Sequence, residues 1–134
     1  MTQRASGSFE VNLAPLATAW SGDTAPLARM SLDKKFTGDL DATSQGEMLS
    51  AGTAVKGSAG YVALEKVTGT LHGRTGTFTL QHSGTMNRGA PSLSITVVPD
   101  SGSGELVGLM GSMQIIIENK QHSYVLDYSI DGAP

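Results

Sequence analysis

Residues 58–86 contain two runs of alternating apolar and polar residues on either side of a short segment, Leu71-His72-Gly73-Arg74. Alternation with a period of two is typical of a β-strand that buries one face. A glycine in the segment between the runs suits a tight turn. The stretch therefore predicts a hairpin of two long strands, and the fold of the chain depends on which further strands extend it.

The same alternation recurs along most of the chain. We expect six further strands, at residues 7–13, 27–36, 38–51, 92–98, 106–118 and 122–130. Residues 14–26 are expected to form a loop with one helical turn around 16–20. No stretch predicts an amphipathic helix of ten or more residues. The 17 glycines, which follow no collagen-like period, suit many short strands and tight turns.

Eight strands with one apolar and one polar face each favour an antiparallel sheet. Such a sheet must either close on itself or split into a sandwich, and closure removes the exposed edges. The 134 residues suit one domain and show no internal repeat. We therefore predict an all-β fold: a single antiparallel eight-stranded barrel over residues 1–134, with little or no helix.

Composition excludes several classes of protein and site. The chain has no cysteine, which excludes disulfides, thiolate catalysis and cysteine metal sites. The net charge is −3 and the nine basic residues are scattered, so nucleic acid is not expected as a partner. No apolar run reaches the length of a membrane span, and the first ten residues do not suit a signal peptide. The expected location is the cytoplasm.

Several segments together resemble a bacterial family, the domain of unknown function family numbered 3224. They are GSFEV (7–11), KKFTGDLDATSQGEML (34–49), SAGYVALEKVTGTLHGRTGTFTLQHSGTM (58–86), VVPDSGSGELVGLMGSM (97–113) and HSYVLDY (122–128). The resemblance implies a short eight-stranded barrel of the allene oxide cyclase-like type in a small bacterial protein that forms a homo-oligomer. It implies no reaction, and no segment matches a cyclase site.

The turn of the central hairpin decides which side chains share a face. A two-residue turn at His72-Gly73 places Glu65 diagonal to His82, and one at Gly73-Arg74 places the two directly opposite each other. A three-residue turn would place Glu65 beside Gln81 instead. The sequence alone leaves these registers open.

Either two-residue turn puts Glu65 and His82 on the same face as Tyr61, Phe78 and Leu80. Phe78 and Leu80 require the interior, which carries Glu65 and His82 inside with them. A carboxylate and an imidazole in an apolar lumen can transfer protons near neutral pH or bind a polar group of a ligand. There are two alternatives: Glu65 and His82 form a buried pair whose hydrogen bonds serve only each other, or Glu65 faces solvent.

Other side chains are weaker candidates. Tyr61, Tyr124 and Tyr128 can reach the lumen, and with Phe78 and Leu80 they are the predicted ligand contacts. Trp20 is expected to plug one end of the core.

Glu47 is a further candidate, because its side chain would point inward only if Gly46 forms a β-bulge.

Metal and phosphate sites are not expected. His72, His82 and His122 lie too far apart in the predicted strands to converge on a metal ion. No glycine-rich segment has the spacing of a phosphate loop, so no cofactor is expected.

Two functional hypotheses and one purely structural alternative follow from these residues. The favoured hypothesis is a barrel that binds a small, largely apolar molecule in its lumen. The alternative is a cofactor-free isomerase, cyclase or lyase with Glu65 and His82 as acid and base. The third is a structural homo-oligomer whose lumen is packed solid.

Overall fold

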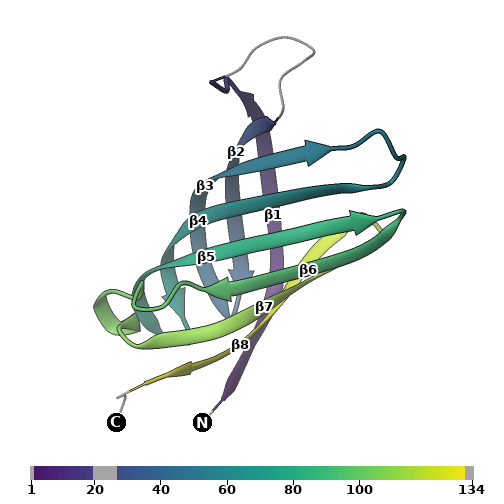
Figure 1. Cartoon of the computed structure of the whole chain (residues 1–134). Helices are drawn as coiled ribbons and strands as arrows, with labels where there is room; N and C mark the ends of the chain where they lie inside the picture. Colours follow the sequence, from purple (N-terminus) through teal and green to yellow (C-terminus); the bar gives the residue numbers. More distant parts are fainter. Residues whose placement is uncertain (1, 20–26, 132–134) are drawn as a thin grey trace.

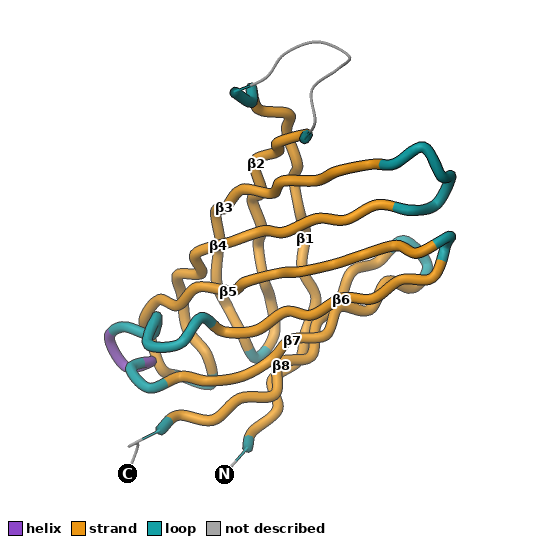
Figure 2. The backbone as a smooth tube through the Cα atoms, viewed as in Figure 1, coloured by secondary structure: helices purple, strands orange, loops and turns teal. Residues whose placement is uncertain are grey.

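The computed structural model describes residues 2–19 and 27–131 of the chain. Eight antiparallel strands close into a barrel in sequence order, and the first strand pairs with the last (Figures 1 and 2). The predicted all-β barrel is therefore confirmed. The strands are β1 (Gln3–Leu16), β2 (Ala28–Gly38), β3 (Leu40–Gly52), β4 (Ala59–Leu71), β5 (Arg74–Asn87), β6 (Ala90–Val97), β7 (Leu109–Glu118) and β8 (Gln121–Ile130).

Several strand boundaries differ from the predicted ones, and two of the differences change the expected structure. β1 continues to Leu16, which pairs with Arg29 of β2, so the helical turn expected from residue 16 does not begin there. Trp20, expected to plug the core, lies outside the described residues. β7 begins only at Leu109, because a 3-10 helix, η1 (Gly104–Leu106), precedes it. Among the described residues, no helix is long and apolar enough to cross a membrane.

The central hairpin turns through two residues, His72 and Gly73. Both have positive φ, 46° and 80°, which is the geometry that matches the twist of a two-residue hairpin. Leu71 therefore pairs with Arg74, and along the same ladder Ala63 lies opposite His82. This is the first of the two predicted two-residue turns, and it places Glu65 diagonal to His82.

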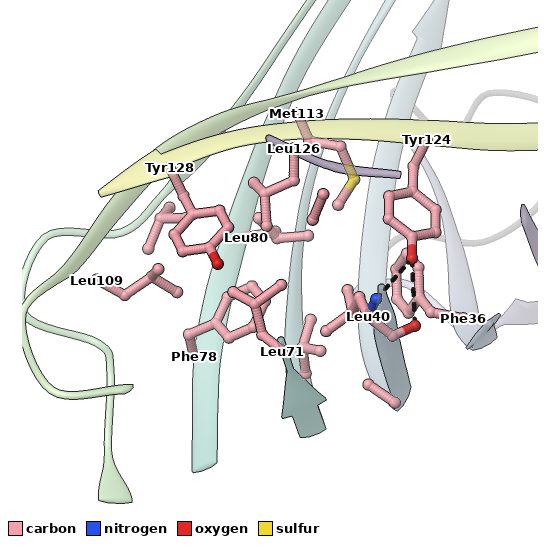
Figure 3. Packing of buried hydrophobic residues seen from close by; sticks show 14 of the residues in the cluster. Phe36, Leu40, Leu71, Phe78, Leu80, Leu109, Met113, Tyr124, Leu126 and Tyr128 are labelled. Atoms are coloured by element: carbon pink, nitrogen blue, oxygen red, sulfur yellow. Dashed lines mark hydrogen bonds between the residues drawn. The ribbon is translucent and has the colours of Figure 1, made fainter. Parts of the chain in front are cut away.

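The inward-facing apolar side chains pack tightly at one end of the barrel (Figure 3). Tyr124 fixes this packing through its hydroxyl. The oxygen accepts the backbone N–H of Leu40 at 2.9 Å, and it lies 2.9 Å from the carbonyl oxygen of Thr37. The hydroxyl thus ties β8 to the β2–β3 turn inside the core.

The segment between β6 and β7 closes this packed end. β6 pairs with β5 only from Leu80 onward, so the first residues of β5 need another partner. The hydroxyl oxygens of Ser101 and Ser103 accept the backbone N–H groups of Thr79 and Thr77, each at 3.1 Å. Leu106, at the end of η1, is fully buried. The Ser- and Gly-rich loop therefore replaces the missing strand and covers the core.

The opposite end of the barrel is less complete. β6 and β7 are joined only through the pairs Ile95–Met113 and Thr96–Ser112. The β3–β4 and β5–β6 hairpins extend beyond the rest of the barrel, at the right of Figure 1. Apolar side chains near this end remain substantially exposed, with Leu13 at 47% and Leu93 at 46%. The barrel thus has one packed end and one open end.

The Tyr124 hydroxyl can be tested by removing it. In Tyr124→Phe the N–H of Leu40 stays buried without an acceptor, so we expect a loss of about 1–3 kcal/mol in the free energy of unfolding. Tyr61→Phe is the matched control, because the structure gives the Tyr61 hydroxyl no hydrogen-bond partner among the described residues. Urea unfolding measures both. Equal stabilities of the two variants would contradict this role.

Candidate functional site

A buried carboxylate with three hydrogen-bond donors lies in the interior of the barrel. One oxygen of Glu65 (β4) accepts from Lys34 Nζ (β2) at 2.9 Å and from His82 Nε2 (β5) at 2.8 Å. The other oxygen accepts from Ser44 Oγ (β3) at 2.7 Å. All four residues are buried. We call Lys34, Ser44, Glu65 and His82 the ionic cluster.

Each member occupies an inward position in the alternation of its strand. Lys34 lies between the buried Leu32 and Phe36, and Ser44 follows the buried Ala42 by two residues. Lys34 and Ser44 are direct partners in the β2–β3 ladder. Sequence reasoning missed both, although the parity of Leu32 and Phe36 already indicated that Lys34 points inward.

A glycine opposite Glu65 makes room for the cluster. Gly46 pairs with Leu32 on one side and with Glu65 on the other, in ladders that run without interruption. A Cβ at Gly46 would lie only 2.8 Å from the Cβ of Glu65. Gly46 therefore permits a close approach of β3 and β4 and does not form a bulge. Glu47 consequently points outward and accepts a hydrogen bond from Arg29 at 2.7 Å.

The cluster keeps Glu65 ionised. Burial alone would raise the pKa of this carboxyl group. The hydrogen bond from His82, the charge of Lys34 and the bond from Ser44 outweigh burial and lower the pKa from 4.5 to about 2. Glu65 is therefore a carboxylate at neutral pH, and its charge is balanced by Lys34.

An ionised carboxylate only accepts hydrogen bonds, so His82 must donate through Nε2. In the neutral imidazole, Nδ1 is then the acceptor. Among the described residues, the structure gives Nδ1 no hydrogen-bond partner. Every fully buried side-chain nitrogen or oxygen of these residues has such a partner. Nδ1 therefore borders accessible space.

His82 also lines a cavity of about 220 Å³ at the open end of the barrel. Lys34 and His82 lie in its wall, whereas Glu65 and Ser44 lie behind them. The remaining wall is mostly apolar and consists of Phe9, Val11, Leu13, Leu32, Met48, Tyr61, Ala63, Leu93, Ile115, Ile117 and His122. We call this space the open-end cavity.

A second, more apolar hollow lies next to the open-end cavity. It measures about 370 Å³ and shares Met48, Tyr61 and Leu93 with it. It extends toward Met86 and Pro91, near the tip of the β5–β6 hairpin. The two hollows are therefore neighbours along the inner face of the hairpins.

The structure separates the predicted site residues into three groups. Tyr61 and His82 line the open-end cavity, and Glu65 supports His82 from behind. The other predicted ligand contacts, Phe78, Leu80, Tyr124 and Tyr128, lie in the packed part of the barrel and do not line this cavity (Figure 3). The alternating pattern assigns a residue to the inner face but does not give its position along the barrel axis. The prediction therefore placed residues of the packed end and of the open end in one site.

The three histidines do not form one group. His72 Nδ1 lies 2.5 Å from the hydroxyl of Tyr128 at the packed end, whereas His122 lines the open-end cavity, as His82 does, and its ring lies at a tilt against that of Phe9. Residues 2–19 and 27–131 contain no group of three or more histidine, aspartate or glutamate side chains arranged to hold a metal ion.

The first prediction for the cluster concerns stability. Lys34→Met leaves the buried Glu65 carboxylate without its counter-charge, so we expect a loss of about 3–5 kcal/mol in the free energy of unfolding. Lys35→Met is the matched control. It breaks the exposed ion pair with Asp41 (3.0 Å), which is expected to contribute less than about 1 kcal/mol. Chemical denaturation of both variants tests this, and similar losses would contradict the burial argument.

A second prediction concerns pH. The pKa of Glu65 is lower in the folded than in the unfolded protein, so its contribution is present above pH 4.5 and is lost as the pH falls toward about 2. We expect urea unfolding of the wild type to show an acid-induced loss on the order of 3 kcal/mol from this group. The loss should shrink in Glu65→Gln or, if that variant is too unstable, in Lys34→Met/Glu65→Gln. An unchanged pH profile would contradict the prediction.

The family model described as "Protein of unknown function (DUF3224)" matches residues 5–128. The structure is also similar to the crystal structure of a protein of unknown function from Shewanella oneidensis MR-1, assigned to the same family. The two share 52% identity and a TM-score of 0.91, over 98% of this chain and 99% of that one. No curated protein matches the chain. The chain therefore belongs to the DUF3224 family.

Proposed function

We propose that this protein binds a small, largely apolar molecule in the open-end cavity. The observation that carries the proposal is the wall of this cavity, where apolar side chains surround two buried, hydrogen-bonding side chains, Lys34 and His82. Sites for small molecules combine an apolar wall with a few fixed polar groups in this way.

The size of the cavity limits the ligand. An apolar cavity of about 150 Å³ holds a benzene molecule. The 220 Å³ of the open-end cavity therefore suit one ring with a short substituent, and the adjoining hollow can receive a longer apolar tail. This space also argues against the hypothesis that the lumen is packed solid throughout.

The polar groups favour binding over acid–base catalysis by Glu65. Its carboxylate already accepts three hydrogen bonds, has a pKa of about 2, and does not line the cavity. It is thus a poor proton donor at neutral pH and is out of reach of a ligand. In an isomerase, cyclase or lyase of this geometry, His82 would contact the substrate and Glu65 would position it.

The proposal can be tested with ethylbenzene as the probe. We expect ethylbenzene at about millimolar concentration to shift the methyl NMR signals of Met48, Leu93 and Ile115, which line the cavity. The methyl signals of Val107 and Ile116, which are exposed on the protein surface, should not shift. Shifts of equal size in both sets, or none in the first, would contradict the proposal.

A variant that fills the cavity strengthens this test. Ala63 lies in the wall directly opposite His82, so Ala63→Phe should occupy the space and abolish the ethylbenzene shifts. Val62→Phe, whose side chain is exposed next to it in the strand, is the matched control. Native mass spectrometry of the freshly purified wild type would show whether a molecule of this class copurifies.

The homo-oligomer implied by the resemblance remains a prediction. A groove of about 870 Å³ crosses the outer face of β3 and β4, where Leu49, Val62 and Leu64 are exposed. An exposed apolar surface of this kind is a reasonable place for a contact between copies. Sedimentation velocity of the wild type and of Leu64→Lys would test it, and a monomeric wild type would overturn it.

A further inference from the structure

We propose that the molecule held in the open-end cavity is aromatic, with its flat ring between aromatic side chains from opposite walls of the barrel. The inference rests on the proposed function, because it names the class of apolar molecule that the cavity would bind. Two observations carry it: the placement of four rings in the cavity wall, and the position of the Lys34 ammonium group beside them.

The four rings belong to two pairs on different walls. Tyr61 (β4) and His82 (β5) form one pair, with 6.4 Å between their ring centres. Phe9 (β1) and His122 (β8) form the other, as direct partners in the β1–β8 ladder with 5.3 Å between their ring centres. In this barrel β5 lies four strands from β1, and β4 lies four strands from β8. Strands that are half the circumference apart face each other across the lumen, and β1 passes behind β4 and β5 in Figure 1.

A glycine lets the Tyr61 ring cover its wall. Gly84 on β5 is the direct partner of Tyr61, and a Cβ at this position would collide with Cε1 of the ring. Glycine in a strand allows another group this close approach to the backbone. One side of the ring therefore rests on β5, and the ring borders both the open-end cavity and the adjoining hollow. Because the ring is only half-buried, it offers aromatic surface to a ligand in that space.

Lys34 gives the same cavity a positive charge that an aliphatic ligand cannot stabilise. Its ammonium nitrogen lies 5.1 Å from the ring centre of Phe9 and 5.7 Å from that of Phe36. Glu65 is the only hydrogen-bond partner that the described residues give this group, which carries three N–H bonds. A ligand that displaces water from Lys34 must replace the lost interaction. The face of an aromatic ring attracts a cation, most strongly where water is excluded, whereas an alkyl group does not.

The rings in the wall select the ligand more sharply than its polar atoms do. The Tyr61 hydroxyl and the nitrogens of His82 and His122 are separate polar sites, and together they do not define one polar group on a ligand. Contacts between aromatic rings, however, are more favourable than the buried area alone predicts. An aliphatic molecule of the same size would gain the buried area only. Benzenoid and heteroaromatic molecules are therefore the class that the cavity favours.

Two soluble probes test the inference on the unaltered protein. Benzyl alcohol and cyclohexylmethanol contain as many non-hydrogen atoms as ethylbenzene and differ from each other only in the aromatic character of the ring. NMR titration gives their dissociation constants. Each constant is corrected by the partition of the probe between water and hexadecane, because the saturated ring is more hydrophobic. After this correction we expect benzyl alcohol to bind about three- to tenfold more tightly.

Variants on both walls locate the preference. Tyr61→Leu and His122→Leu each remove one half-buried ring, so the dissociation constant of cyclohexylmethanol divided by that of benzyl alcohol should fall about threefold in each. Tyr61→Phe and His122→Phe restore a ring and should restore the ratio. Val62→Leu, an exposed neighbour of Tyr61 outside the cavity, is the matched control. The hydrophobicity of the probes cancels here, because the same two probes are compared in every protein.

The outcomes separate this inference from the proposed function. If cyclohexylmethanol binds as well as benzyl alcohol after the correction, or if the ratio is unchanged in either leucine variant, the inference is wrong and the proposed function stands. The same holds if ethylbenzene binds but benzyl alcohol does not. If neither the two probes nor ethylbenzene binds, both the inference and the proposed function are overturned. The comparison on the wild type remains decisive if a leucine variant does not fold.

Discussion

The carboxylate of Glu65 is the constraint on which the rest of the barrel depends. A buried charge without partners would cost more free energy than a small domain can spare, so its three donors must all be in place. They come from β2, β3 and β5, which surround Glu65 on β4. A slip of one residue in any of these ladders would turn a donor outward. The carboxylate thus penalises every register but the observed one.

The same cluster divides the barrel into two parts. Beyond it, toward η1, the inward side chains are apolar and the Ser- and Gly-rich loop covers them. On its other side, β6 and β7 share only two pairs and the hairpins extend past the barrel. Stability is therefore concentrated at the packed end. The open end can contain a cavity because the fold does not depend on filling it.

Alternation predicted nearly all of the fold, but only part of the site. It placed Glu65 and His82 on one inner face, and the turn at His72 and Gly73 then selected the register. Lys34 and Ser44 were missed because a lysine or serine in an alternating strand suits solvent equally well. Their contact with Glu65 depends on the close approach of β3 and β4 at Gly46, which the pattern of a single strand does not contain.

The ionic cluster is difficult to explain by stability alone. Apolar residues of similar volume often replace a buried ion pair without loss, and sometimes with a gain. Apolar residues could not, however, place a fixed acceptor and a charged donor in the wall of a cavity. Glu65 does this by accepting one hydrogen bond from Lys34 and one from His82 Nε2, which holds both side chains in the wall of the open-end cavity. The free energy spent on burying the charge is thereby converted into a preorganised polar site.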